Sequence, residues 1–339
     1  MYQIKRIVLL TTFVCAVSAC SKHQKISNDM EAYTDRLSTF TGISVNKPQI
    51  DASLMAPKKS ELQKPVEQVS INLREFYAYK QCALNQLIAE RNTALGKMQQ
   101  PSSRYLYERS LIDELAACRV VLEASEQSAD EKSKLIAKLS EWQSVKERTL
   151  PAVWANFISQ SDEIYSSMTQ AQDFIAAAPS DNFQATRQAW QFLATSFESQ
   201  TLNSTTLENH LKELENARLL ARMWRTQSYI SAQLDATSPL LEEYLQQNQC
   251  SDRKQEEDIK VMRNIFSLLF ADKIQPLAAE LNKYHYQLSP LLEQLVSTSF
   301  LPGALNDYIQ LQLGIKHERY KQSMQRHIKL WQEIFARCG

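Results

Sequence analysis

The sequence contains very little glycine, with only 5 glycines in 339 residues. Average proteins contain about 7% glycine. Sheet proteins need glycine at many turns, so this scarcity argues against a β fold. Leu, Ala, Gln, Glu and Lys dominate instead, and all five residue types favour helices. We therefore predict an all-α fold, an elongated multi-helix bundle built from long antiparallel helical hairpins.

An apolar run long enough to span a membrane, about 20 residues, is also missing. The N-terminus carries an eleven-residue apolar run, Ile7–Val17, directly after the basic pair Lys5 and Arg6. A basic start and a short apolar run are typical of a secretory signal peptide. The run is followed by small residues and a cysteine, Val17–Cys20, a register that resembles the bacterial lipobox.

The lipobox predicts that Cys20 is acylated and becomes the first residue of the mature chain. Several acyl chains together hold a protein stably on a membrane. Residue 21 is Ser, whereas the best-known sorting rule places Asp there for inner-membrane retention. We therefore expect an outer-membrane lipid anchor facing the periplasm. An ordinary secretory peptide with an incidental cysteine is the alternative.

This interpretation divides the chain into three parts. Residues 1–19 form the lipoprotein signal peptide, residues 20–65 a lipid-anchored N-terminal helix and linker, and residues 66–339 the helical body. A subdivision of the body near 180–204 is one option. Without residues 1–19, 36 Lys and Arg face 38 acids, a formal net charge of −2. Nothing in this balance favours a nucleic-acid partner, which would need a basic face.

Hydrophobic spacing and breaker residues predict nine helices. Pro65 and Pro151 are expected at helix starts, Thr205 with Glu208 as a capping box, and Pro276 as a kink or break. The predicted spans are about 27–40, 65–97, 103–123, 129–147, 151–165, 183–198, 205–230, 252–281 and 305–335.

Four cysteines remain after removal of Cys15 and lipidation of Cys20, and an oxidising compartment favours their pairing. They are Cys82, Cys118, Cys250 and Cys338. In a hairpin that turns near residue 100, Cys82 and Cys118 lie level on antiparallel helices. We therefore predict the disulfides Cys82–Cys118 and Cys250–Cys338. Four free buried thiols are the alternative.

Catalytic patterns are missing. No GxSxG, SxxK or phosphate-binding loop occurs. The histidines show no HExxH pattern, and we expect surface or capping roles for His23, His210, His285, His317 and His327. His317 and His327 lie too far apart on one predicted helix to share an ion. We therefore predict no metal and no cofactor. Paired carboxylates of a glycosidase are explained more simply as solvated helix faces.

One polar cluster surrounds the predicted hairpin turn near residues 99 and 100. Its members, drawn from both sides of the turn, are Glu90, Arg91, Asn92, Lys97, Arg104, Tyr107 and Glu108. Crossing Arg–Glu pairs would lock the tip of the hairpin, and we favour this structural role. The alternative is a small polar recognition patch.

The same hairpin carries a resemblance to a known family. The lipobox, Leu87–Asn92 with Leu95-Gly96-Lys97, and Pro101-Ser102 with Tyr107-Glu108 are together similar to a family of gammaproteobacterial lipoproteins of unknown function. The Ile274-Gln275-Pro276 segment and the tail His327–Gln332 through Cys338-Gly339 share this similarity. The resemblance covers nearly the whole mature chain and implies no activity or catalytic residue.

We expect a non-enzymatic protein that binds or scaffolds another envelope component, with an envelope protein as one partner and the membrane, through the acyl chains, as the other. A peptidoglycan glycosidase and a periplasmic binder of a small apolar ligand are the alternatives. Two acids about 5–10 Å apart in a polar groove would favour the glycosidase. A closed apolar cavity would favour the ligand binder, and a flat exposed apolar patch would favour the partner-binding protein.

Overall fold

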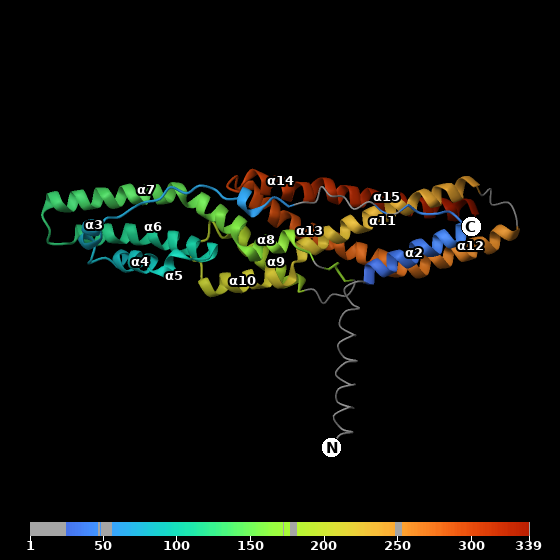
Figure 1. Cartoon of the computed structure of the whole chain (residues 1–339), viewed down its shortest axis with the longest axis horizontal. Coiled ribbons are helices and arrows are strands. Elements are labelled where there is room, and N and C mark those ends of the chain that lie inside the picture. The colour runs from blue at the N-terminus through green and yellow to red at the C-terminus, as the bar shows by residue number, and fades with distance from the viewer. Residues whose placement is uncertain are drawn as a thin grey trace, which may run out of the picture.

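The computed structural model describes residues 25–46, 48, 56–171, 173–176, 182–247 and 253–338. Within these ranges the chain forms helices and no strand, which confirms the all-α prediction. Most helices run along one long axis, and the molecule is elongated (Figure 1). The described part contains no helix that is long and apolar enough to cross a membrane.

The first described helix, α2 (Lys25–Thr41), confirms the helix predicted at 27–40. Its buried face repeats at spacings of three and four residues, which is the pattern of an amphipathic helix. The helix ends at Gly42, whose φ of 71° lies in the left-handed region that glycine adopts without strain. α2 packs against α11 and against the segment 266–274 (Figure 1).

The continuous helix predicted over 65–97 is wrong. Residues 62–72 are not helical, and helix formation starts again where the Asn72 side chain accepts a hydrogen bond from the backbone N–H of Glu75. Cys82 then stands in extended backbone directly before the next helix, so the chain turns there. The observed elements are η2 (Lys59–Glu61), α3 (Leu73–Ala78), α4 (Ala83–Arg91) and α5 (Ala94–Lys97).

Two long helices form a hairpin beside these short elements (Figure 1). α6 (Pro101–Glu123) confirms the prediction at 103–123, and α7 (Ala129–Gln160) merges two predicted helices into one. Pro151 lies inside α7 instead of opening a helix. Proline removes one backbone hydrogen bond, but burial of α7 residues on both sides of it holds the helix together. α8 (Asp162–Thr169) follows.

The middle of the chain contains α9 (Phe183–Thr195), close to the predicted span, then α10 (Ser204–Ala217) and α11 (Leu219–Gln247). The predicted capping box at Thr205 is wrong, because the Asn203 side chain caps α10 by accepting from the Thr206 N–H. The helix predicted through residue 230 is broken at Arg218, which has a φ of 44°.

The last third forms two long helical paths that contain π turns. The first comprises α12 (Arg253–Ile265), η3 (Phe266–Ile274) and α13 (Gln275–Ser297). Pro276 was expected to kink or break it, but the chain forms π turns directly before the proline and continues as a helix. The second comprises α14 (Gly303–Leu311), η4 (Gln312–Lys316) and α15 (His317–Cys338), and agrees with the prediction at 305–335.

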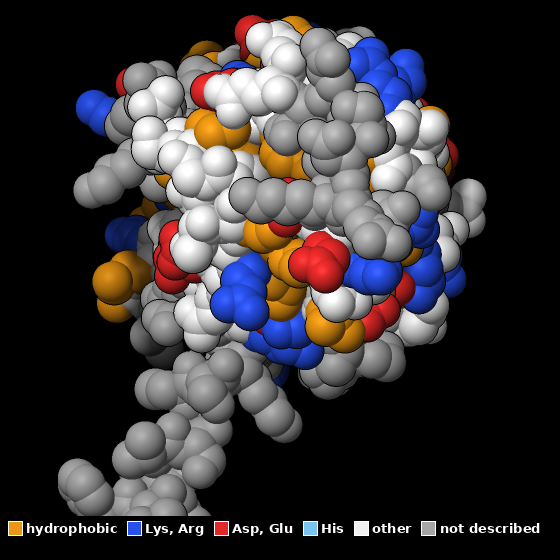
Figure 2. Space-filling view, turned by 90° about the vertical axis from the view of Figure 1, so that its right-hand side faces the viewer, with side chains coloured by type: hydrophobic (Ala, Val, Ile, Leu, Met, Phe, Trp, Pro, Cys, Tyr) orange, Lys and Arg blue, Asp and Glu red, His pale blue; other side chains and the backbone are white. Residues whose placement is uncertain are grey.

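The buried apolar side chains form two separate clusters. The larger cluster extends from α2 to α15, and the smaller one lies within residues 79–142 of α4, α6 and α7. The end of the molecule at the right in Figure 1 is shown in Figure 2, where basic and acidic side chains alternate around small apolar areas. No single sign of charge gathers among the described side chains visible on that face.

Candidate functional site

A disulfide fixes the position of α4 against α6. Cys82 precedes α4 and Cys118 lies on α6, and the two are bonded with their Cα atoms 5.3 Å apart. The predicted pair Cys82–Cys118 is therefore confirmed, although Cys82 lies before α4 and not inside the continuous helix from which the pair was inferred. Cys338 also belongs to a disulfide. Cys250 and Cys20 lie outside the described residues, so the second pair and the lipidation stay predictions.

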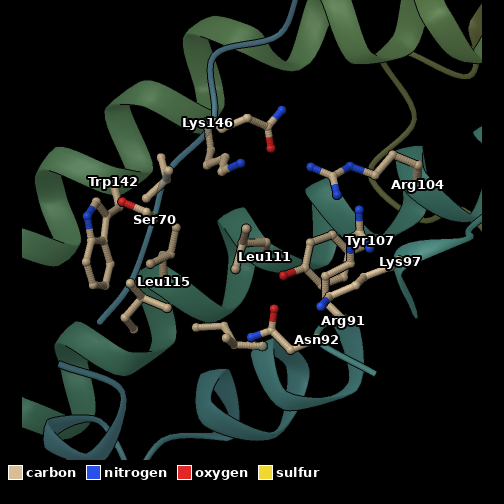
Figure 3. Close-up of a pocket in the computed structure, with 14 residues that line it drawn as sticks. Ser70, Arg91, Asn92, Lys97, Arg104, Tyr107, Leu111, Leu115, Trp142 and Lys146 are labelled. Atoms are coloured by element: carbon tan, nitrogen blue, oxygen red, sulfur yellow. The ribbon is translucent and has the colours of Figure 1, made fainter. Parts of the chain in front are cut away.

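A pocket of about 410 Å³ opens between α4, α5, α6, α7 and the extended segment 68–71 (Figure 3). Its wall combines basic side chains with aromatic and aliphatic ones. The lining residues are Gln68, Val69, Ser70, Ile71, Ile88, Arg91, Asn92, Lys97, Arg104, Tyr107, Leu111, Leu115, Trp142 and Lys146. We call it the cationic pocket.

Two guanidinium groups converge on one aromatic ring in this pocket. The central carbons of Arg91 and Arg104 lie 6.0 and 5.5 Å from the centroid of the Tyr107 ring. This is the range in which a cation is attracted to an aromatic face. Figure 3 shows the Arg91, Arg104 and Tyr107 side chains together on one side of the pocket and Lys146 reaching in from α7 on the other.

The surrounding residues compensate the charge and the hydrogen-bond donors of Arg91 only in part. Its guanidinium donates a hydrogen bond to the Gly96 carbonyl, but its buried Nε has no hydrogen-bond partner among the described residues. Burial and the nearby charge of Arg104 lower the pKa of Arg91. A shift in this direction means that the charged form is stabilised less than in water. An anion bound in the pocket would stabilise the charged guanidinium of Arg91.

The carboxylate next to the pocket is already engaged. Glu108 is buried and forms ion pairs with Arg104 on its own helix and with Lys146 on α7. The Lys146 Nζ lies 3.0 Å from Glu108 Oε2. Crossing Arg–Glu pairs were expected to lock the tip of the hairpin, but Glu108 pairs with Arg104 on its own helix and with Lys146 of α7.

The structure brings most of the predicted polar cluster together. Arg91, Asn92, Lys97, Arg104 and Tyr107 all line the cationic pocket, and Glu108 lies directly behind it. Glu90 is exposed, accepts a hydrogen bond from Gln86 and does not belong to the lining.

Sequence reasoning missed the contribution of α7 and of segment 68–71. Lys146 follows Leu139 and Trp142 on the buried face of α7. The sequence did contain a signal for Lys146, because it lies on the same helical face as apolar residues and a buried lysine needs a partner of opposite charge. The extended segment gave no signal, since its alternating apolar residues also fit a helical pattern when Pro65 is placed in the first turn.

A second hollow of about 390 Å³ adjoins the cationic pocket and shares three of its residues, Gln68, Arg91 and Arg104. Its remaining wall comes from α7 and from the residues around Lys64 and Pro101. The two arginines therefore belong to the walls of both depressions.

The chemistry of the lining favours an anionic ligand. Four cationic side chains and no carboxylate line the pocket. Counting Glu108 behind it, this neighbourhood has a formal charge of +3. Arginine forks match the geometry of phosphate and carboxylate groups, and Tyr107 and Trp142 offer flat faces for a ring.

Three of the histidines do not have the expected surface or capping positions, whereas His210 is half-buried and His23 lies outside the described residues. His285, His317 and His327 are buried. His285 and His317 stack face to face with ring centroids 3.3 Å apart, although they lie on different helices. The described residues contain no group of three or more His, Cys, Asp or Glu that could hold a metal ion.

Comparison with known proteins gives a family and no activity. Neither a curated protein nor a solved structure matches the chain. A family described as "Protein of unknown function (DUF3080)" matches residues 30–339, which agrees with the resemblance to an uncharacterised family noted in the sequence. The chain belongs to the DUF3080 family.

Proposed function

We propose that this chain is a lipid-anchored envelope protein that binds an anionic envelope component in its cationic pocket. One observation carries the proposal: four cations and no carboxylate line the pocket, and the nearby carboxylate of Glu108 is already paired with Arg104 and Lys146. The cationic pocket is thus the candidate site for the binding function expected from the sequence, and its charge favours a negatively charged ligand.

The ligand class follows from the side chains. Arg91 at the end of α4 and Lys97 at the end of α5 form no ion pair with a described carboxylate, so their charges are available to a phosphate or carboxylate group. Arg104 and Lys146 also hold Glu108. A charge-assisted hydrogen bond to such a group contributes about 1.5–3 kcal/mol. The aromatic and aliphatic wall suits the ring of a sugar or another flat apolar surface.

The glycosidase alternative fits this pocket poorly. Glycoside hydrolysis uses two carboxyl groups that face the substrate. The residues lining the pocket provide cations, two amides, hydroxyls and apolar groups, and Glu108 is buried behind them. The pocket therefore supports binding better than hydrolysis.

Three matched sugars test the proposal by NMR titration of the ¹⁵N-labelled mature protein. N-acetylglucosamine 6-phosphate, N-acetylmuramic acid and N-acetylglucosamine present a phosphate, a carboxylate and no charge on the same ring. We expect one or both acidic sugars to shift the signals of residues around Arg91 and Tyr107, while the neutral sugar does not. Equal shifts from all three sugars, or no shifts, would contradict the proposal.

The anchor has its own test. Cys20→Ala should release the protein from the membrane fraction, because it removes the acylated side chain. Mass spectrometry that finds an unacylated N-terminus in the wild-type protein would contradict the anchor without affecting the pocket.

A further inference from the structure

A second cavity, of about 280 Å³, lies far along the chain from the cationic pocket and shares no lining residue with it. It is lined by residues of α8, α11, α14 and η4 and by Ala171 and Phe174. Its wall is mostly apolar or aromatic and includes Met168, Phe174, Trp224, Tyr229 and Tyr308. The charged side chain in its lining, Arg225, already donates to the Ala171 carbonyl and lies 5.0 Å from the centroid of the Phe174 ring. We call it the α8–α11 cavity.

Two polar atoms on residues of this wall lack partners. The Trp224 indole Nε1 and the Gln312 amide Oε1 are buried, and neither has a hydrogen-bond partner among the described residues. The two side chains are only 3% and 1% exposed. Buried polar groups in native proteins are nearly always hydrogen-bonded, so a pair of orphaned atoms at one cavity indicates an absent partner.

The orientation of the Gln312 amide is fixed by its surroundings. The Tyr308 hydroxyl donates to the Met168 carbonyl at 3.1 Å. Burial raises the pKa of this phenol, and a hydrogen bond with the Gln312 side chain, which lowers the pKa, offsets part of that rise. A bond that lowers the pKa of a phenol is donated to it, so the amide NH₂ of Gln312 is occupied and its oxygen remains.

The backbone around Gln312 supports a functional role for this position. Gln312 opens the π-helical segment η4, which interrupts an otherwise α-helical path from Gly303 to Cys338. Short π-helical segments within α-helices occur frequently at functional sites.

We infer that the α8–α11 cavity binds a small uncharged molecule with a hydroxyl or amide group on an apolar body. The ligand must accept a hydrogen bond from Trp224 and donate one to Gln312, and hydroxyl and amide groups do both. A carboxylate has no proton to donate, and an ammonium cannot accept. An apolar cavity of about 150 Å³ holds benzene, so 280 Å³ suits a substituted ring or a short branched chain.

Benzamide and toluene, which share a ring and differ in the polar group, test this inference. The probes are titrated into the ¹⁵N-labelled mature protein while the indole N–H signals of its five tryptophans are followed. Trp224→Phe identifies the signal of Trp224. We expect benzamide to shift that signal and to bind more tightly than toluene, because only benzamide satisfies both orphaned atoms.

Two variants separate recognition from folding. Gln312→Leu should weaken benzamide binding roughly tenfold, the effect of one neutral hydrogen bond, and leave toluene binding unchanged or stronger. Gln310→Leu, at an exposed position of the same helix, is the matched control. If Gln312→Leu fails to fold, Ala232→Leu fills the cavity while keeping both polar groups and should abolish binding of both probes.

Two results would contradict this inference. Benzamide that binds no better than toluene would show that Trp224 and Gln312 do not select the ligand. A Trp224 signal that neither probe moves up to its solubility limit would show that the cavity holds water only. Either result would overturn the inference, and neither would affect the cationic pocket.

Discussion

Lys146 of α7 and Glu108 of α6 form a buried ion pair, with Nζ and Oε2 3.0 Å apart. The two side chains are 5% and 2% exposed, so the charges have little water around them. The pair connects the two long helices directly behind the cationic pocket and, through Arg104, fixes one wall of that pocket.

Breaking this pair should destabilise the protein strongly. Lys146→Met removes one of the two cations that pair with the buried Glu108 carboxylate and leaves only Arg104, and we expect the free energy of unfolding to fall by about 3 kcal/mol. Lys138→Met, which breaks the exposed pair of the same helix with Glu141, should cost at most about 1 kcal/mol. Urea unfolding measures both variants, and similar losses would argue against burial of the Lys146–Glu108 pair.

Gly96 is required by the close packing of α5 on the end of α4. A Cβ at this position would lie 2.3 Å from the Glu90 carbonyl oxygen and 2.7 Å from that of Arg91. Gly96→Ala should therefore lower the free energy of unfolding by about 1–3 kcal/mol and disturb Arg91, which donates to the Gly96 carbonyl. Gly303→Ala, whose Cβ would meet nothing within 4 Å, should cost little. Thermal unfolding of both variants checks this, and equal melting temperatures would refute the requirement.

The disulfides can be identified chemically. Non-reducing peptide mapping should yield Cys82–Cys118, and we still predict Cys250–Cys338 as the second pair. The first bond joins residues separated by 36 positions, for which the chain-entropy account gives about 4 kcal/mol of stabilisation. Cys82→Ser with Cys118→Ser should lose a comparable amount in urea unfolding. A peptide that links Cys82 to Cys250 or Cys338 would contradict the hairpin register.

Three buried histidines should make the protein sensitive to acid. Burial is the largest cause that lowers the pKa of His285 and of His317 to about 4 and that of His327 to about 3, and the stacked His317 ring contributes to the shift of His285. In the unfolded chain these imidazoles have a pKa of about 6.5. Between pH 6.5 and 4 the unfolded chain therefore binds more protons, and stability falls as the pH falls.

Each histidine contributes up to about 1.4 kcal/mol of lost stability per pH unit in that window. His327 forms hydrogen bonds with Tyr33 and Ser238, so His327→Gln should lower the free energy of unfolding at pH 7. The variant should also show a smaller change of stability with pH between pH 6.5 and 4. Urea unfolding at several pH values measures the slope. A variant with an unchanged slope would show that His327 is not held neutral by burial.

The sequence predicts those features of the fold that depend on local pattern. α2, α6 and α15 were found from apolar spacing, and the level positions of Cys82 and Cys118 were found from helical rise. The break at Arg218 and the continuity of α7 through Pro151 depend on tertiary packing, which overrides local preference. Segment 62–72 was misread because its apolar residues satisfy both helical and extended periods.

The sequence predicts only those parts of the site that local pattern brings together. Arg91, Asn92 and Tyr107 could be placed together because one hairpin connects them. Lys146 and the stacked pair His285–His317 come from helices whose contact no local pattern specifies. Their partners are set by tertiary packing, so they could be identified only in the folded structure.

The most direct test of the account is the affinity of the cationic pocket for an acidic sugar. Isothermal titration calorimetry would compare the wild type with Arg91→Gln and with Arg74→Gln, an exposed arginine of α3 that does not line the pocket. Loss of one charge-assisted hydrogen bond should weaken binding by roughly tenfold or more in Arg91→Gln, and Arg74→Gln should bind like the wild type. Equal affinities for all three proteins would contradict the assignment of the cationic pocket as the binding site.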